Sequence, residues 1–99
     1  MKKTPLTFMP YAQAGTVQEG QHIALISYKT HVCGVIDNQA YCYGTFSRTT
    51  IRHIGAFSKQ VGQGLSYYIF KKCWRLNAIY YTNLKCFVSI ETGEILEWG

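Results

Sequence analysis

The spacing of apolar residues becomes helical at one place in this chain, and this limits the folds that the chain can adopt. Between residues 49 and 61 apolar side chains recur every three or four positions, as on one face of an amphipathic helix. Ser47, Thr49 and Thr50 are residue types that favour a helix start. Gly62 follows as a type that favours a helix end. We therefore expect one helix at about residues 49–61.

Strand-type sequence precedes this helix. Residues 22–28, 30–36 and 40–46 are rich in aliphatic and aromatic side chains that favour extended structure. The polar residues 37–39 separate the last two segments and favour a turn. The sequence therefore predicts a hairpin of residues 30–36 with residues 40–46, preceded by a strand near residues 22–28.

Strand-type sequence also follows the helix. Residues 67–70, 79–81 and 86–90 are runs of aromatic and aliphatic side chains, which are typical of strands. Thr92 and Gly93 favour a turn between the last run and the final residues of the chain. For residues 74–81 a helix is an open alternative.

These elements predict an α+β fold. We expect a single antiparallel β-sheet of five to six strands, with one α-helix at about residues 49–61 packed on one face. A chain of 99 residues has material for one hydrophobic core, so residues 1–99 are expected to form a single compact domain. Residues 1–20 are expected to be an irregular N-terminal segment.

The sequence favours a cytoplasmic protein of a host cell, without membrane contact. The first residues contain two lysines but no apolar run of the kind found in a signal peptide. No segment approaches the roughly 20 apolar residues that span a bilayer. In that compartment the four cysteines are expected to be reduced thiols, mostly in the core.

Histidine and cysteine side chains are the usual protein ligands of zinc, and this chain has three histidines and four cysteines. His31, Cys33, Cys42 and His53 are the candidate ligands. Zinc sites usually take ligands in close pairs, whereas Cys33 and Cys42 are nine positions apart. We therefore expect neither a metal site nor another cofactor.

Charge is distributed unevenly along the chain. Residues 38–90 contain seven Lys and Arg and no Asp or Glu, although the whole chain carries only +5. The five acids lie before and after this basic block. Because a local positive field attracts polyanions, the partner is expected to be acidic.

Two groups of residues are the candidate binding site. Arg48, Thr49 and Arg52 lie in the first turn of the expected helix, where free N–H groups and the helix dipole favour an anion. The alternative is that the hydroxyls cap the helix and the arginines are solvated. Rings and cations also alternate in residues 67–75, where filling of the core is the alternative to base stacking. The candidate binding residues are Arg48, Thr49, Arg52, Lys59, Tyr68, Lys71, Lys72, Trp74 and Arg75.

The sequence does not favour an enzyme. No motif places a nucleophile beside a base, and the acids lie outside the basic block. A Gly-rich phosphate loop is also missing, because Gly62 and Gly64 follow the helix instead of preceding it.

The segment "LISYKTHVCGVIDNQAYCYGTFSRTTIRHIGAF" resembles a family of small accessory proteins from bacteriophages and other mobile elements. The shared pattern is a "SYxTxV" strand followed by a "TTxxHI" helix start. The matching residues are Ser27, Tyr28, Thr30, Val32, Thr49, Thr50, His53 and Ile54. The family supplies no catalytic residue, but the resemblance implies a phage protein that binds host machinery, as CRISPR-Cas inhibitors do.

Two functions follow as hypotheses. The first is a non-enzymatic inhibitor that docks through its basic, aromatic residues on a host protein or nucleoprotein, for example a CRISPR-Cas effector. The second is direct binding of nucleic acid, with contacts to phosphates and stacking on bases.

Overall fold

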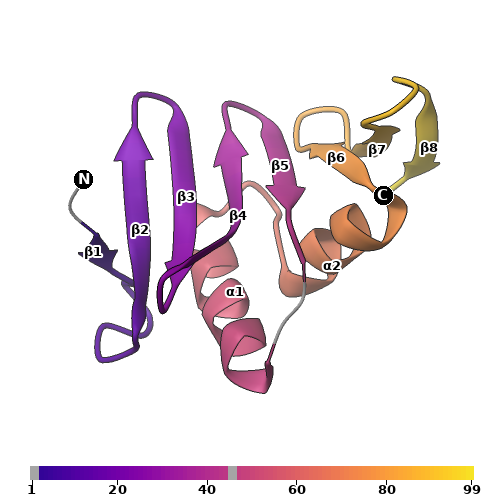
Figure 1. Ribbon diagram of the computed structural model, residues 1–99. Helices are drawn as coiled ribbons and strands as arrows, with labels where there is room; N and C mark the ends of the chain where they lie inside the picture. Colours follow the sequence, from indigo (N-terminus) through magenta and orange to yellow (C-terminus); the bar gives the residue numbers. More distant parts are fainter. Residues whose placement is uncertain (1–2, 45–46) are drawn as a thin grey trace.

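A computed structural model describes residues 3–44 and 47–99 of the chain, which contain eight strands and two helices (Figure 1). The strands are β1 (Thr4–Pro5), β2 (Ala14–Glu19), β3 (His22–Ser27), β4 (Thr30–Ile36), β5 (Gln39–Cys42), β6 (Ala78–Tyr81), β7 (Cys86–Ser89) and β8 (Ile95–Trp98). The helices are α1 (Arg48–Val61) and α2 (Tyr67–Leu76).

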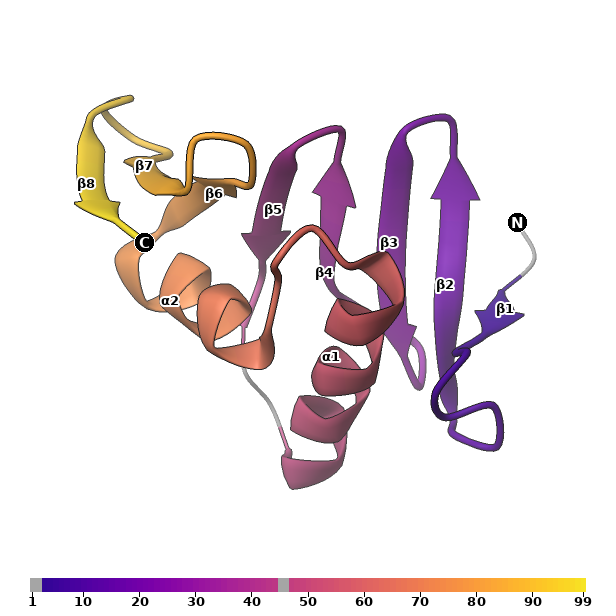
Figure 2. The ribbon, with the colours of Figure 1, turned by 180° about the vertical axis from the view of Figure 1, so that it is seen from behind.

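All eight strands form one antiparallel sheet whose spatial order is the order of the chain, from β1 to β8. Both helices belong to the connection between β5 and β6. Figure 2 shows α1 and α2 side by side on one face of this sheet. The α+β class with one antiparallel sheet is therefore confirmed. We refer to α1 and α2 as the helical layer and to the other side of the sheet as the open face.

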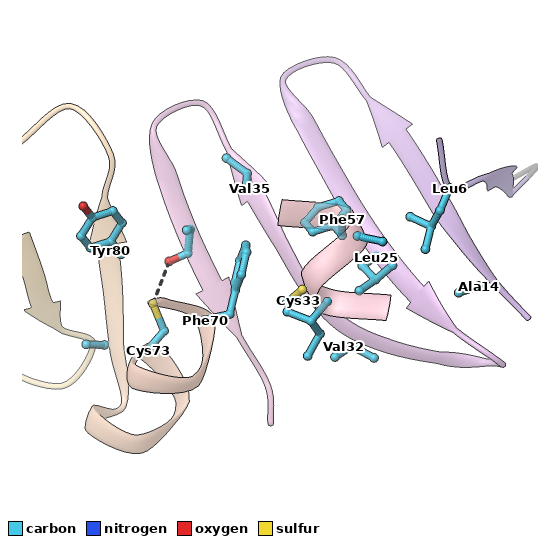
Figure 3. Packing of buried hydrophobic residues seen from close by; sticks show 14 of the residues in the cluster. Leu6, Ala14, Leu25, Val32, Cys33, Val35, Phe57, Phe70, Cys73 and Tyr80 are labelled. Carbon is cyan, nitrogen blue, oxygen red and sulfur yellow. Dashed lines mark hydrogen bonds between the residues drawn. The ribbon is translucent and has the colours of Figure 1, made fainter. Parts of the chain in front are cut away.

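The hydrophobic core lies between the sheet and the helical layer (Figure 3). Leu25 and Val32 from the strands are fully buried, as are Phe57 from α1 and Phe70 from α2. The rings of Phe57 and Phe70 contact each other, with their centroids 5.9 Å apart. Burial of each such side chain stabilises the fold by about 1.5–3 kcal/mol, so the two phenylalanines fix both helices on the sheet.

The helix expected at residues 49–61 is confirmed as α1, and the first cap is now identified. The side-chain oxygen of Ser47 accepts a hydrogen bond from the backbone N–H of Thr50 at 3.2 Å. Thr49 is exposed. The helix ends at Gly62, whose φ of +76° suits a residue without Cβ.

The expected hairpin is also confirmed. β4 pairs with β5 around a turn at Asp37 and Asn38, and β3 precedes it. β5 ends at Cys42, earlier than expected. Thr45 and Phe46, which were included in the predicted strand, lie outside the described residues.

The strand predicted at residues 67–70 was wrong, because this run belongs to helix α2. The apolar side chains that face the core are Ile69, Phe70, Cys73 and Leu76, whose spacing is that of a helix. Consecutive aromatic residues concealed this period. The alternative left open for residues 74–81 is settled by Asn77, which ends α2 with φ +53° and separates it from β6.

The number of strands was also underestimated, since the sheet has eight instead of five to six. Residues 1–20 are not uniformly irregular, because they contain β1 and β2. β2 pairs with β3 over its full length, and its Ala14 and Thr16 are buried. Its sequence, AGTVQE, has little strand propensity, so it is held by pairing and burial more than by its residue types.

Candidate functional site

A chain of hydroxyl groups joins the start of α1 to the end of β3. Thr50 Oγ1 lies 3.3 Å from Ser47 Oγ and 3.2 Å from Ser27 Oγ. Ser27 Oγ is in turn hydrogen-bonded to Nδ1 of His53 at 2.8 Å. Ser27, Thr50 and His53 are all buried, so this network joins the helical layer to the sheet.

Tyr28 covers one side of this network. Its ring centroid lies 5.9 Å from that of His53. It follows Ser27 directly and has φ +58°, a left-handed conformation that is uncommon for a residue with a side chain. Ser27, Tyr28, Thr50 and His53 come from the two halves of the "SYxTxV" and "TTxxHI" pattern, which the fold brings to one place.

Ser27 and His53 have the spacing of a nucleophile and its base. Their exposed fractions are only 2% and 1%, and a substrate would have to reach the serine oxygen. Burial lowers the pKa of His53, and the positive charge of Arg52 lowers it further. The pair therefore acts, in this conformation, as a neutral hydrogen-bonded contact between α1 and β3.

The basic residues predicted on α1 lie on its outer surface. Arg48, Arg52 and Lys59 are exposed and fall on one stripe of the helix. Arg52 and Lys59 line a shallow hollow of about 310 Å³, whose other wall includes Phe8 and Met9.

The candidate residues on α2 also face outward, although they were expected on a strand. Lys71 and Arg75 are exposed, and they share a hollow of about 280 Å³ with Tyr68 and Lys72. Tyr68 is 75% exposed and Trp74 47% exposed, so neither ring fills the core. Lys72 differs from the other cations, because it is partly buried and forms an ion pair with Glu97 of β8.

Two acids lie against α2: Glu97 pairs with Lys72, and Glu91 accepts a hydrogen bond from the side chain of Asn77, the residue that ends the helix, at 3.4 Å. Glu19 ends β2, Asp37 lies in the β4–β5 turn, and Glu91 and Glu94 lie between β7 and β8. Figure 1 shows these connections at one end of the sheet, at the top of the view. The positive charge on α1 is therefore left largely uncompensated, whereas Glu91 and Glu97 offset part of the charge on α2.

The open face holds a second cluster, which the sequence interpretation missed. The hydroxyl oxygen of Tyr41 lies 2.6 Å from Nε2 of His22 and 2.7 Å from Nε2 of His31. Tyr43 packs edge-on against His31, with ring centroids 5.0 Å apart. Burial raises the pKa of Tyr41, and the neighbouring Tyr43 raises it further.

Gly34 makes this arrangement possible. It lies in β4 directly opposite Tyr41 of β5. A Cβ at this position would collide with the Tyr41 ring, 2.7 Å from its Cζ, and would lie 2.8 Å from the backbone oxygen of Ile23. The tyrosine ring therefore lies over the glycine. The signal for this cluster in the sequence was a glycine inside a strand, which marks a close approach of another group.

Two hollows flank the cluster. One of about 250 Å³ is mainly apolar, with Ile36, Ile79 and Ile90 beside His22 and Tyr41. The other, of about 240 Å³, is lined by Glu19, His22 and His31 together with small and aliphatic side chains. His22 forms a wall of both.

The four metal-ligand candidates named from the sequence do not meet. His31 belongs to the open face, whereas Cys33 is buried in the core and His53 lies under α1. Within residues 3–44 and 47–99, no group of three or more His, Cys, Asp and Glu side chains is assembled for a metal ion. Burial raises the pKa of Cys33 and Cys42, and that of Cys73 to about 12, so these thiols are protonated.

Neither α1 nor α2 has the length and apolar character needed to cross a bilayer, over the part of the chain that the structure describes. A model of the family of unknown function DUF8033 matches residues 5–72. The chain belongs to this family. The matched region includes the hydroxyl and histidine network of α1, the Tyr41 cluster and the first half of α2, whereas β6 to β8 follow it. No curated protein and no solved structure matches the chain.

Proposed function

We propose that this chain is a binding protein that docks on an acidic surface of a host protein or nucleoprotein through its helical layer, and thereby inhibits the partner. The observation that carries the proposal is the arrangement of five exposed cations on the outer sides of two helices that cover the same face of the sheet. These are Arg48, Arg52, Lys59, Lys71 and Arg75.

A protein surface suits this layer because of the rings between the cations. Tyr68 and Trp74 are exposed at the same helix as Lys71 and Arg75. Tyr, Trp and Arg are the residues that contribute most to the hot spots of protein interfaces. Opposite charges on the partner would increase the association rate and fix the orientation of docking.

The choice of target rests on the resemblance to phage accessory proteins, and the proposed target is a nucleoprotein effector such as CRISPR-Cas. In this mechanism the basic helical layer occupies an acidic surface of the effector or blocks the assembly of the effector. It requires no chemistry from the Ser27–His53 pair, which is buried.

The test is a pull-down from nuclease-treated bacterial lysate, followed by a cleavage assay with a purified effector. The variant that carries both Lys71→Glu and Arg75→Glu reverses two charges of α2, and Lys85→Glu is its control because Lys85 is exposed in the β6–β7 connection. We expect the wild type and the control to recover a stoichiometric partner and inhibit it, and the double variant to do neither. Equal recovery by all three proteins would contradict the proposal.

Direct nucleic-acid binding is the second candidate, and the first turn of α1 favours it. Arg48 and Thr49 are exposed there, and the first turn contains no acid. Each phosphate contact with a single strand should add about 0.7 to the slope of log affinity against log salt. Anisotropy with short oligonucleotides measures that slope, and Arg48→Ala with Arg52→Ala should reduce it while leaving stability unchanged. Affinity that is constant between about 50 and 200 mM salt would eliminate this candidate.

A further inference from the structure

The His22–Tyr41–His31 cluster has a hydrogen-bonding pattern that leaves both imidazoles directed at one point. A phenol has a single proton, so Tyr41 donates to one imidazole and accepts from the other. Both contacts are made by Nε2 atoms, at 2.6 Å and 2.7 Å, although His22 and His31 lie on different strands. The two ring centroids are 6.2 Å apart.

We propose that this cluster is a binding site for a divalent transition-metal ion, with His22, His31 and Tyr41 as the protein ligands and Zn²⁺ as the reference ion. In a tetrahedral site with bonds of about 2.0–2.1 Å, neighbouring ligand atoms are about 3.3 Å apart. The Nε2-to-hydroxyl distances of 2.6 Å and 2.7 Å would therefore have to increase by only about 0.6–0.7 Å on metal binding.

The strands support the geometry that such a site needs. Ala24 and Gly34 are directly paired and lie between the two histidines along the sheet, so that small residues leave room for both imidazoles to lean together. The three ligands thus lie on paired strands and not in a loop, with His31 next to the bulge between Leu25 and Ile26.

Glu19 can complete the coordination only by rotating toward the histidines, since the three side chains are not assembled as a metal site in this conformation of the described residues. It is paired with His22 across β2 and β3, and it lines the same hollow of about 240 Å³ as both histidines. Its side chain is exposed and is therefore free to rotate. Two imidazoles with a carboxylate or a phenol are the nitrogen and oxygen donors that Zn²⁺ and Cu²⁺ accept.

Metal binding to this cluster has a defined proton balance. Both ligating nitrogens must be unprotonated, so the proton that one Nε2 donates to Tyr41 moves to the other ring nitrogen. If Tyr41 binds as phenolate, its proton passes to the solvent, and one proton is released for each ion bound. The Tyr41 hydrogen bonds to the two histidines are then replaced by bonds to the metal.

The experiment is a titration of the full chain with ZnCl₂ in the presence of a phosphine reductant, followed by calorimetry and by NMR of the imidazole resonances. We expect one equivalent of Zn²⁺ to shift the signals of His22 and His31 and to leave His53 unchanged. His22→Gln and His31→Gln should each weaken binding by at least about tenfold. Because the NMR readout uses the wild type, it tests the site even if a variant does not fold.

Two control variants separate this site from adventitious binding. Tyr43→Phe removes a hydroxyl next to the cluster, and Cys42→Ser removes the most accessible thiol of the cysteine pair that faces across β4 and β5. Both should bind Zn²⁺ as the wild type does. The proposal is overturned if the wild type binds no Zn²⁺, if the histidine signals do not move, or if Cys42→Ser alone abolishes binding.

Discussion

Two clusters of histidine and hydroxyl groups lie on opposite sides of the same sheet, and they differ in what covers them. Under α1, His53 is bonded to Ser27 at 2.8 Å and both residues are buried. On the open face, His22 and His31 are bonded to Tyr41 at 2.6 Å and 2.7 Å, and they border two hollows. Similar hydrogen bonds thus serve two purposes. The first cluster holds two layers together, and the second remains within reach of a ligand.

The substitution with the largest expected effect is Gly34→Ala, which acts on the open cluster. The new Cβ would collide with the Tyr41 ring and the Ile23 backbone oxygen, so we expect the free energy of unfolding to fall by about 3 kcal/mol. Tyr41 should also leave its two histidines. Chemical denaturation measures the first effect and NMR of the imidazoles the second.

Gly55→Ala is the control for this change. Gly55 lies inside α1, and a Cβ there meets no atom within 4 Å. Alanine should therefore stabilise the protein by about 0.5–1 kcal/mol through its helix propensity. If Gly34→Ala and Gly55→Ala changed the free energy of unfolding equally, the position of the Tyr41 ring would not depend on Gly34.

The next effect should come from His53→Ala, which breaks the covered cluster. It leaves the Ser27 hydroxyl with one partner fewer and creates a cavity, so we expect a loss of about 2–3 kcal/mol. Tyr41→Phe, which removes the central hydroxyl of the open cluster, should cost less because solvent can reach its histidines. If Tyr41→Phe lowers the free energy of unfolding more than His53→Ala does, the assignment of roles to the two clusters is wrong.

His53 also predicts how stability depends on pH. Its pKa is lowered in the folded protein from the ordinary value of 6.5, mainly by burial. The unfolded chain therefore binds more protons at mildly acidic pH, and the contribution of His53 is fully present above pH 6.5 and is lost as the pH falls below it. Unfolding at several pH values should show a shallower decline for His53→Gln than for the wild type. Identical slopes would mean that His53 is not buried as a neutral group.

A smaller effect is expected at the end of the covered cluster. Ser47→Ala removes the N-cap of α1 and should cost about 1 kcal/mol. Thr49→Ala is the matched control, since Thr49 is the exposed hydroxyl two positions later and should be neutral within about 0.5 kcal/mol. The reverse result would place the cap at Thr49.

The smallest expected effect is that of Lys72→Ala in the helical layer. Its ion pair with Glu97 is partly exposed, and its amino group lies 5.5 Å from the centre of the Phe87 ring. Such pairs contribute about 0–1 kcal/mol, and screening by salt should reduce the effect further. Thermal unfolding at low and high salt tests this, and a large effect that is independent of salt would indicate a packing role instead.

The fold was predictable where one residue pattern dominates. The period of three and four in α1 and the hairpin of β4 and β5 are local signals, and both were confirmed. α2 was missed because tyrosine and phenylalanine occupy neighbouring positions in residues 67–70, and strand preference then outweighs helical spacing. β1 and β2 were missed because β1 is held by pairing with β2 and β2 by pairing with β3, and pairing is not a property of their own residues.

The candidate site was predictable as a set of charges but not as an arrangement. The uneven charge distribution identified Arg48, Arg52 and Lys71, and the structure shows all three exposed on the outer sides of the helices. The Tyr41 cluster had only one signal in the sequence, Gly34 inside a strand, because the register of β3, β4 and β5 is what brings His22, His31 and Tyr41 together. The partner of the positive helical layer stays a prediction.

The sequential order of the strands has a consequence for how the chain folds. Each of β1 to β5 pairs with its neighbour in the chain, so these hairpins close short loops and can form early. The pairing of β5 with β6 is different, since it joins Gln39 to Tyr81 across both helices. Docking of α1 and α2 on the sheet would shorten the free loop that this pairing has to close. We therefore expect β6 to β8 to join the sheet after the hairpins of β1 to β5 have formed and the two helices have docked on them.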